Sequence, residues 1–302
     1  MLKCSYRLIF VFTLFPVCIS AQNALVFQTD FGVKDGAVAV MKGVAYSVSP
    51  DLNIFDLTHE IPPFNVWEAA YRLDQTAEYW PAGTVFVSVV DPGVGSERKS
   101  VVLKTSSGHY FVSPDNGTLT FVANSLGIAA VREIDEAINR RKSSEESYTF
   151  HGRDVYAYTG ARLAANVIGY EEVGPVLPAQ VFSIPYTKAK FENGIVVGNI
   201  PILDINFGNI WTNIDKQIFN RLKATKGDKI RVKISCGEKV IFDEKIPFVN
   251  TFADVPFGVS LIYFNSLNKI ALAINQGNFS QSYKIGSGSE WNIQLGGDRK
   301  LH

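Results

Sequence analysis

Four short segments of this 302-residue chain place acidic, basic, amide or imidazole side chains beside glycines. They span residues 28–32, 89–98, 148–154 and 204–213. The first two follow predicted strands, and ligands of open α/β sheets bind at the carboxyl ends of strands. A carboxylate there can accept hydrogen bonds from two neighbouring ribose hydroxyls. The fourth segment combines an acid, an amide and an aromatic ring, a set that could hold an ammonium group and the edge of a planar ring.

Each segment also has an ordinary structural interpretation. Asp30 and Asp91 lie in turn-forming sequences, and Asp204 begins an Asx-rich turn. A single histidine such as His151 is more often structural than catalytic, but this one lies in a turn at a helix start, where functional residues concentrate. No His-x-x-His or Cys-x-x-Cys spacing accompanies it, so the sequence does not predict a zinc site.

Strand and helix patterns alternate in the first half of the chain. Helical spacing of apolar residues follows Asp35, Val66 and Asp154, and the Asp35 carboxylate could cap the first of these helices. This alternation predicts a three-layer α/β domain over residues 22–185. The expected strands are 24–28, 53–57, 84–90, 100–104 and 110–113.

The second half shows short strands separated by turns and no long helical period, which predicts a small β-barrel or sandwich over residues 186–302. We expect the domain boundary between Val176 and Phe191. The clearest strands are 195–199, 229–234, 239–242, 261–264 and 270–274.

The N-terminus has the pattern of a signal peptide. Lys3 and Arg7 precede an apolar run over residues 8–17, and small or aliphatic residues follow up to Ala21. We therefore expect cleavage after residue 21 and a periplasmic or secreted protein. A lipoprotein with lipid on Cys18 is the weaker alternative, because the residues before Cys18 make a poor lipobox.

Composition excludes several other classes. Cleavage would remove Cys4 and Cys18 and leave Cys236 alone, so no disulfide within the chain is expected. The 29 basic residues balance the 29 acidic ones without a basic stripe, which argues against nucleic-acid binding. A hydrophobic content of 46% argues against disorder. No run after residue 21 is long enough for a stable membrane span.

Taken in chain order, these segments resemble the S-adenosylmethionine (SAM) hydroxide adenosyltransferase family, whose relatives include fluorinating and chlorinating enzymes. The resemblance runs from Thr29-Asp30-Phe31-Gly32 to Asn275-Gln276-Gly277. It implies an N-terminal α/β domain, a C-terminal β-barrel, and a homotrimer with each site between the N-terminal domain of one subunit and the C-terminal domain of the next. The motifs between these ends include Ser113-Pro114-Asp115-Asn116-Gly117, Phe150-His151-Gly152-Arg153-Asp154, Phe207-Gly208-Asn209, Thr251-Phe252-Ala253-Asp254-Val255-Pro256 and Tyr263-Phe264-Asn265-Ser266.

The resemblance also assigns site residues. It places the catalytic triad of the hydrolytic members on Asp91, Arg98 and His151. The substrate-binding positions comprise a ribose-binding acid, an aromatic wall, adenine contacts and groups around the methionine end. They are Asp30, Phe64, Asp204, Phe207, Asn209, Phe252, Asn265, Ser266 and Asn275.

Three positions depart from the halogenating relatives. Asp91 and Gly152 stand where the fluorinating enzyme has Tyr and the Ser of its halide pocket, and Leu267 stands where it has an Arg near the methionine carboxylate. The span from Lys104 to Tyr110 is too short for that enzyme's extra loop. The first two differences favour water over halide. Leu267 cannot bind the methionine carboxylate as an Arg could, so the sequence does not determine how the amino-acid end of the substrate is bound.

The expected reaction is therefore attack of water on the 5′ carbon of SAM, which releases adenosine and methionine. His151 and Asp91 would orient the water and take its proton, and Arg98 would stabilise hydroxide character. The scheme requires no metal and no organic cofactor. The alternatives are halide-dependent adenosyl transfer and a periplasmic adenosine-binding protein without turnover. SAM is chiefly a cytosolic metabolite, so the leader leaves the physiological substrate open.

Overall fold

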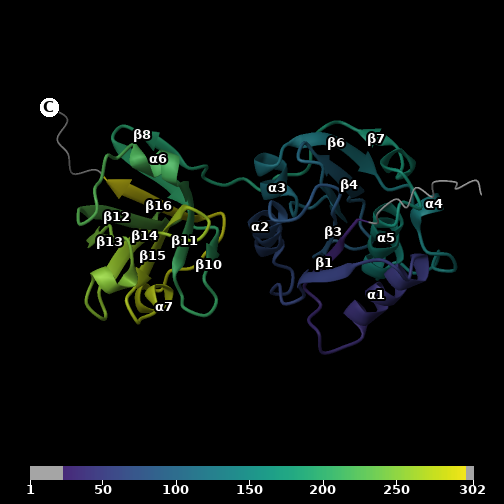
Figure 1. The fold of residues 1–302 in the computed structure, drawn as a ribbon, viewed down its shortest axis with the longest axis horizontal. Coiled ribbons are helices and arrows are strands. Elements are labelled where there is room, and N and C mark those ends of the chain that lie inside the picture. Colours follow the sequence, from purple (N-terminus) through teal and green to yellow (C-terminus); the bar gives the residue numbers. More distant parts are fainter. Residues whose placement is uncertain (1–22, 297–302) are drawn as a thin grey trace, which may run out of the picture.

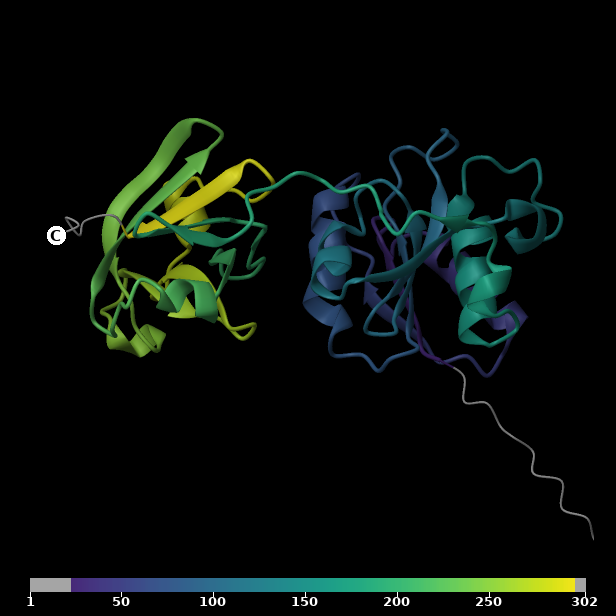
Figure 2. The same cartoon turned by 90° about the horizontal axis from the view of Figure 1, so that it is seen from above.

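The computed structural model describes residues 23–296, which form two domains (Figures 1 and 2). The predicted signal peptide, with Cys4 and Cys18, lies outside the described residues. Residues 178–189 carry no helix or strand and connect the last strand of the first domain to the first strand of the second. None of the helices within 23–296 is long and apolar enough to cross a membrane.

The N-terminal domain is built on one seven-stranded mixed sheet of order β2-β1-β3-β5-β4-β6-β7. Strands β2, β1, β3 and β5 are parallel, whereas β4, β6 and β7 join by antiparallel pairing. Because β1 and β3 are parallel neighbours, the residues that follow them meet at one edge of the sheet. The strands are β1 (Leu25–Thr29), β2 (Ile54–Thr58), β3 (Val85–Val89), β4 (Ser100–Thr105), β5 (Tyr110–Pro114), β6 (Ile128–Glu133) and β7 (Val176–Leu177).

Helices cover both faces of this sheet. Side chains alternate along a strand, so Phe27 of β1 packs with Met41 of α1, whereas its neighbour Val26 packs with Leu73 of α2. All residues of β3 are buried, as expected for a strand covered on both faces. The N-terminal domain therefore has three layers. Its α-helices are α1 (Ala37–Val48) and α5 (Tyr158–Ala164) on one face, α2 (Val66–Ala77) and α3 (Thr120–Ser125) on the other, and the short α4 (Glu136–Asn139).

One helix begins earlier than its sequence pattern predicts. We expected it to start after Asp154, but a π-helix, η1 (Gly152–Ala157), precedes α5, and His151 is its N-cap residue. Asp154 is fully buried inside this turn, where its carboxylate binds the guanidinium groups of Arg153 and Arg141. These two ion pairs satisfy the buried charge and let the acid lie within the helix.

The C-terminal domain contains two antiparallel sheets, of order β10-β11-β15-β14 and β13-β12-β16-β9-β8. Their inner faces share one apolar core, and Phe248, just after β13, pairs with Ile262 of β14. The strands are β8 (Lys190–Glu192), β9 (Ile195–Asn199), β10 (Ile202–Leu203), β11 (Ile210–Asp215), β12 (Lys229–Cys236), β13 (Lys239–Pro247), β14 (Ser260–Phe264), β15 (Lys269–Ile274) and β16 (Trp291–Gly296). The short helices are α6 (Lys216–Asn220) and α7 (Phe279–Tyr283), with 3-10 turns η2 (Tyr170–Glu172) in the first domain and η3 (Phe252–Asp254) here.

The two domains of the chain touch through α2 and α3. The Trp67 indole of α2 donates a hydrogen bond of 2.8 Å to the carbonyl oxygen of Pro201. Trp67 also packs with Tyr71 and Phe121 against Ile202 of β10. This contact lies on the helical layer of the N-terminal domain.

Candidate active site

A cavity of about 240 Å³ lies where β1 and β3 end. The predicted residues Asp30, Phe64, Asp91 and His151 all line it, together with Gly152. Asp30 follows β1, Asp91 follows β3 shortly after its last residue, and His151 precedes η1. Three segments distant in sequence therefore bring two carboxylates and an imidazole to one hollow.

Arg98 does not line the cavity but lies behind Asp91. Its Nε donates to Asp91 Oδ1 at 2.7 Å and its Nη2 donates to Oδ2, so the guanidinium holds both carboxylate oxygens. Nη1 donates to Ser100 Oγ at 3.3 Å, and the group sits 5.8 Å from the centre of the Tyr156 ring. Burial is the largest single influence and disfavours the charge, but the hydrogen bonds to Asp91 together with the nearby acidic groups outweigh it and raise the pKa of Arg98. Arg98 thus stays a cation that fixes the orientation of Asp91.

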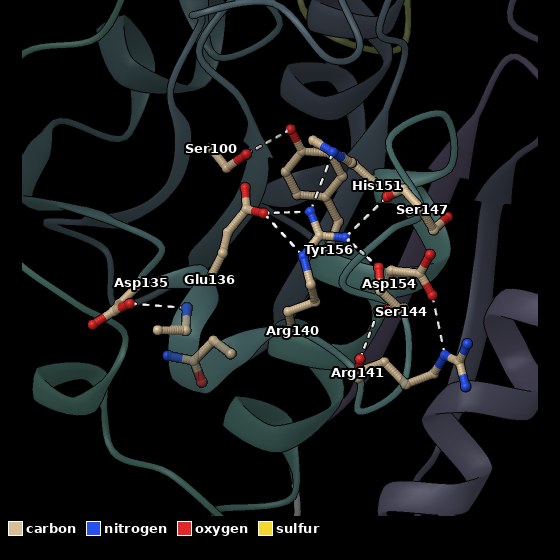
Figure 3. A network of polar contacts seen from close by, with 12 residues as sticks. Ser100, Asp135, Glu136, Arg140, Arg141, Ser144, Ser147, His151, Asp154 and Tyr156 are labelled. Atoms are coloured by element: carbon tan, nitrogen blue, oxygen red, sulfur yellow. Dashed lines mark hydrogen bonds and ion pairs between the residues drawn. The ribbon is translucent and has the colours of Figure 1, made fainter.

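His151 is buried and lies against a second ion pair. Its Nε2 is 3.3 Å from Nη2 of Arg140, and Arg140 in turn binds Glu136 (Figure 3). Burial is the main cause that lowers the pKa of His151; Glu136 opposes it, whereas the nearby Arg140 and Arg98 add to it. His151 is therefore neutral near pH 7. Its Nδ1 is buried and has no hydrogen-bond partner among residues 23–296.

Asp30 fixes the aromatic wall of the cavity as well as lining it. Its Oδ2 accepts a hydrogen bond of 2.9 Å from the backbone N–H of Phe64. Phe64 has a φ of 67°, a left-handed conformation that is costly for an aromatic residue, and its ring is 71% exposed. Strained backbone of this kind persists where surrounding contacts enforce it, and it concentrates at binding sites.

A chain of polar groups, buried at Thr29 and His59 and exposed at Asp56, supports the turn that carries Asp30, and the sequence analysis did not identify it. Thr29 Oγ1 lies 2.8 Å from His59 Nδ1, and His59 Nε2 lies 3.0 Å from Asp56 Oδ1. Thr29 Oγ1 also accepts from the N–H of Phe31. The order acid, imidazole, hydroxyl matches that of a nucleophilic triad, but Thr29 is fully buried, so the chain positions the turn rather than attacking a substrate. The available signal was the spacing Asp56-x-x-His59, with Asp56 in β2 and His59 directly after it.

Gly152 occupies a place where a side chain would be tightly packed. A β-carbon there would lie 3.2 Å from Val89 Cγ1, 3.3 Å from Phe150 Cε2 and 3.4 Å from Phe31 Cε2. The cavity wall around residue 152 is thus formed by apolar groups already in contact with the backbone. A hydroxymethyl group at this position would require those neighbours to move.

A second, larger cavity of about 930 Å³ lies in the C-terminal domain. The structure brings together there all seven residues predicted in this domain: Asp204, Phe207, Asn209, Phe252, Asn265, Ser266 and Asn275. Leu267 does not line it; its N–H donates to Asn265 Oδ1. Trp211, Tyr263 and Asn278, which the sequence analysis did not assign to the site, also line this cavity.

Several polar groups of this cavity already hold the loops that form it. Asn209 Nδ2 lies 3.4 Å from Asp204 Oδ2, and Asn275 Nδ2 donates to the Val255 carbonyl at 2.8 Å. Gly208 has a φ of 65°, and a β-carbon on it would lie 2.0 Å from Asn278 Oδ1. Only glycine fits here, which explains the Phe207-Gly208-Asn209 sequence.

The two cavities have no lining residue in common among those described. Each is bordered by large apolar side chains that are mostly exposed. Phe64 lines the N-terminal cavity, and Val33 is close in sequence to its lining residues. Phe207 lines the C-terminal cavity, and Ile205 and Phe257 are close in sequence to its lining residues. All five residues are more than 60% exposed. Within residues 23–296, no group of three or more His, Cys, Asp or Glu side chains could hold a metal ion.

Comparisons with known proteins identify both domains. Residues 25–174 match the SAM hydroxide adenosyltransferase N-terminal domain, and residues 198–292 match the corresponding C-terminal domain. An (R)-S-adenosyl-L-methionine hydrolase of Methanocaldococcus jannaschii is 39% identical over 269 residues, which cover 87% of this chain and 89% of the relative. A fluorinase of Actinoplanes is 29% identical over 290 residues, with 87% and 95% covered.

A solved structure supports the same fold. An uncharacterized conserved protein of Thermotoga maritima superposes with a TM-score of 0.80 and is 36% identical, covering 90% of this chain and all of that one.

Proposed function

The chain belongs to the SAM hydroxide adenosyltransferase family, and we propose that it hydrolyses (R)-S-adenosyl-L-methionine to adenosine and L-methionine. The observation that carries the choice of water is the buried Asp91–Arg98 pair beside His151, at a cavity next to the ribose-binding candidate Asp30. The hydrolases of M. jannaschii and Thermus thermophilus, at 39% and 31% identity, support the same assignment.

The reaction breaks the bond between the sulfonium sulfur and the 5′ carbon, and its electron pair stays on sulfur as the neutral thioether of methionine. A water oxygen forms the new bond to the 5′ carbon, and one proton is released. Holding water and the 5′ carbon at attack distance can contribute about 7–11 kcal/mol. In our proposal Asp30 accepts hydrogen bonds from the ribose, Asp91 faces the water, and Arg98 keeps Asp91 oriented.

We further propose that the complete site forms between subunits of a homotrimer. Asp30, Asp91 and His151 line one cavity and the methionine- and adenine-binding candidates line another, so one substrate molecule needs both sets. The exposed apolar residues bordering each cavity support burial against a neighbouring subunit. We also propose that the two C-terminal sheets together form the small β-barrel predicted from the sequence. The signal peptide and a periplasmic or secreted location remain part of the proposal, and fractionation of the source cells tests them.

The halide-dependent alternative is disfavoured by the residues around position 152. Gly152 is closed in by Val89, Phe150 and Phe31, and Asp91 places a carboxylate beside the same cavity. A halide needs uncharged donors and is repelled by a carboxylate. Incubation with chloride or fluoride should therefore yield no halogenated nucleoside.

The test of the proposed function uses each sulfonium epimer of SAM in ¹⁸O-labelled water. We expect adenosine and methionine from the (R) epimer, with the label in the 5′ hydroxyl of adenosine. Unlabelled adenosine would overturn direct attack by water. Binding of adenosine without any turnover, unaffected by His151→Ala, would instead identify a nucleoside-binding protein.

A further inference from the structure

Arg140 holds His151 from behind the cavity. It is the C-cap residue of α4, and its side chain is about nine-tenths buried. Nε and Nη2 donate to Glu136 Oε2 at 3.1 and 2.5 Å, and Nη1 donates to the carbonyl oxygens of Ser144 and Ser147 at 3.2 and 3.1 Å. The remaining N–H of Nη2 faces His151 Nε2 at 3.3 Å (Figure 3). All five guanidinium N–H groups therefore have an acceptor.

This contact determines where the imidazole proton lies. A guanidinium has donors only and stays protonated in proteins, so His151 Nε2 must present its lone pair to Arg140. A neutral imidazole that accepts at one nitrogen carries its proton on the other. The proton of His151 is therefore on Nδ1. An imidazolium would place an N–H at Nε2, directly against the N–H of Arg140.

We propose that Arg140 is a positioning residue that keeps His151 in its neutral Nδ1–H form, so that His151 donates a hydrogen bond to the attacking water instead of taking its proton. The part that concerns water rests on the proposed function, whereas the tautomer follows from the contact with Arg140 alone. This changes the role that the sequence suggested for His151, which paired it with Asp91 as an acceptor of the water proton.

The surroundings of Nδ1 fit a donor that lacks its acceptor. Within residues 23–296 this buried atom has no hydrogen-bond partner, and the ring lines the same cavity as Asp91. A water oxygen could accept from Nδ1–H while one of its protons faces the Asp91 carboxylate. As the new C–O bond forms and the C–S bond breaks, that proton passes to Asp91 and then to solvent, and His151 keeps its own proton throughout.

The charged groups around the His151 ring also favour its neutral form. Burial is the largest influence that lowers the pKa of His151; Arg140 behind it and Arg98 across the cavity add to this effect. Glu136 and Asp91 oppose it, but each carboxylate is bound by one of those two guanidinium groups. The other charged groups on the π-helix, Arg153 and Asp154, pair with each other, and Tyr156 is uncharged because burial raises its pKa.

Arg140 also fixes the loop that leads to His151. Its bonds to the carbonyls of Ser144 and Ser147 tie residues 141–150 to the end of α4. One side chain therefore sets both the protonation and the place of the imidazole. Lysine would keep the charge, but its three donors on a single nitrogen could not bind Glu136, both carbonyls and His151 together.

The decisive experiment is ¹⁵N NMR of the full chain labelled at histidine, with His151→Gln used to assign the His151 signals. At pH 7 we expect a protonated Nδ1 and an unprotonated Nε2 in the unsubstituted protein. In Arg140→Met the preference of the proton for Nδ1 over Nε2 should weaken, and the pKa of His151 should rise by about one unit. Arg141→Met is the matched control, because its guanidinium binds Asp154 instead of His151.

Enzyme kinetics supply the second readout. Arg140→Met should lower kcat more than tenfold with a smaller change in KM, and should move the acid limb of the pH profile upward. Glu136→Gln keeps the shape of its side chain but removes the anion that favours imidazolium, so it should move the acid limb downward. In Arg140→Lys, which keeps the positive charge, the acid limb should move upward less than in Arg140→Met. If Arg140→Met does not fold, the opposite shift in Glu136→Gln still tests the proposal.

A proton on Nε2 in the unsubstituted protein, or an unchanged His151 spectrum in folded Arg140→Met, would overturn the proposal. Its failure is distinguishable from failure of the proposed function. The NMR result does not require turnover, and the labelled-water experiment does not depend on the tautomer. An Nδ1–H tautomer in a protein that does not hydrolyse SAM would leave Arg140 a positioning residue and remove only the water-donor role.

Discussion

The backbone N–H of Phe64 donates to Asp30 Oδ2 at 2.9 Å, although 34 positions separate the two residues. The bond joins the turn after β1 to the loop before α2, and it holds Phe64 at a φ of 67° on the rim of the N-terminal cavity. Asp30 therefore has two acceptor tasks, one toward the protein backbone and one toward the ribose hydroxyls in the proposed function. Because these tasks use different properties of the side chain, substitution can separate them.

Asp30→Asn should raise KM about tenfold or more while changing stability little. The amide keeps an oxygen that can accept from the Phe64 N–H, but it loses the charge that strengthens hydrogen bonds from the ribose. Asp30→Ala should lose both and lower the free energy of unfolding by about 1 kcal/mol. Steady-state kinetics and urea unfolding measure the two effects. Asp35→Asn is the control and should leave KM unchanged, because among residues 23–296 the Asp35 carboxylate accepts only from the N–H of Ala37 at the exposed start of α1.

Phe64→Gly should separate the strained backbone from the aromatic ring. Glycine adopts positive φ without the steric cost that phenylalanine bears, and the Phe64 ring is mostly solvent-exposed in the single chain. Urea unfolding should therefore show a stability within about 1 kcal/mol of the unsubstituted protein. KM should rise because the aromatic wall is gone. A KM equal to that of the unsubstituted protein would remove Phe64 from the binding site.

Asp91 and Arg98 should be strongly coupled in stability. Their side chains are 5% and 12% exposed, so removing one partner leaves a buried charge without compensation. Arg98→Met should cost about 3–5 kcal/mol of unfolding free energy, and Asp91→Leu with Arg98→Met together should cost less than the sum of the single changes. A double-mutant cycle by urea unfolding measures the coupling. If the stability costs of the two single substitutions simply added in the double variant, the ion pair would not be coupled. Asp91→Leu, Arg98→Met and the double variant should all lack hydrolysis.

The stability of the protein should depend on His151 below neutral pH. Its pKa is lowered in the folded state from the ordinary 6.5, so the unfolded chain binds the proton more readily. This contribution to stability is present above pH 6.5 and is lost as the pH falls through the lower folded-state value. His151→Gln should therefore flatten the decline of Tm from pH 7 toward acid. The same slope in both proteins would show that His151 is not held neutral.

Local sequence patterns located Asp30 and Asp91 because strand ends are visible in the sequence, whereas the family resemblance supplied the other predicted site residues. Asp30 and Asp91 each follow an apolar strand, and the parallel pairing of β1 with β3 then places them at one edge. Arg140 was not predictable in this way. It ends a four-residue helix with no periodic signal, and its contact with His151 arises only because an intervening loop folds back.

The same limit applies to other features. Thr29, His59 and Asp56 form a hydrogen-bonded chain only because β2 is the parallel neighbour of β1, which single-strand patterns do not reveal. The π-helix at Gly152 was missed because a residue such as Asp154 normally caps a helix, whereas here two arginines neutralise it inside the turn. Tertiary contacts, absent from any local pattern, decide these cases.

Two inactive variants should restore each other if the site lies between subunits. Asp91→Asn changes only the N-terminal cavity and Asp204→Asn only the C-terminal one, and both substitutions keep the shape of the side chain. Each protein alone should lack hydrolysis. The two chains are co-expressed with different tags, and assemblies that contain both are isolated.

In a closed ring, each site takes its N-terminal cavity from one subunit and its C-terminal cavity from the next. Every trimer that contains both chains then has one of its sites with both cavities intact, and activity should return to about a third of the unsubstituted level. If one chain formed the whole site, every site would keep one substitution and mixing would restore nothing. Asp91→Asn combined with Asp204→Asn in one chain, co-expressed with the unsubstituted chain, provides the converse control. In assemblies that contain both chains it should leave about a sixth of the sites between subunits intact, but about half if each chain acts alone.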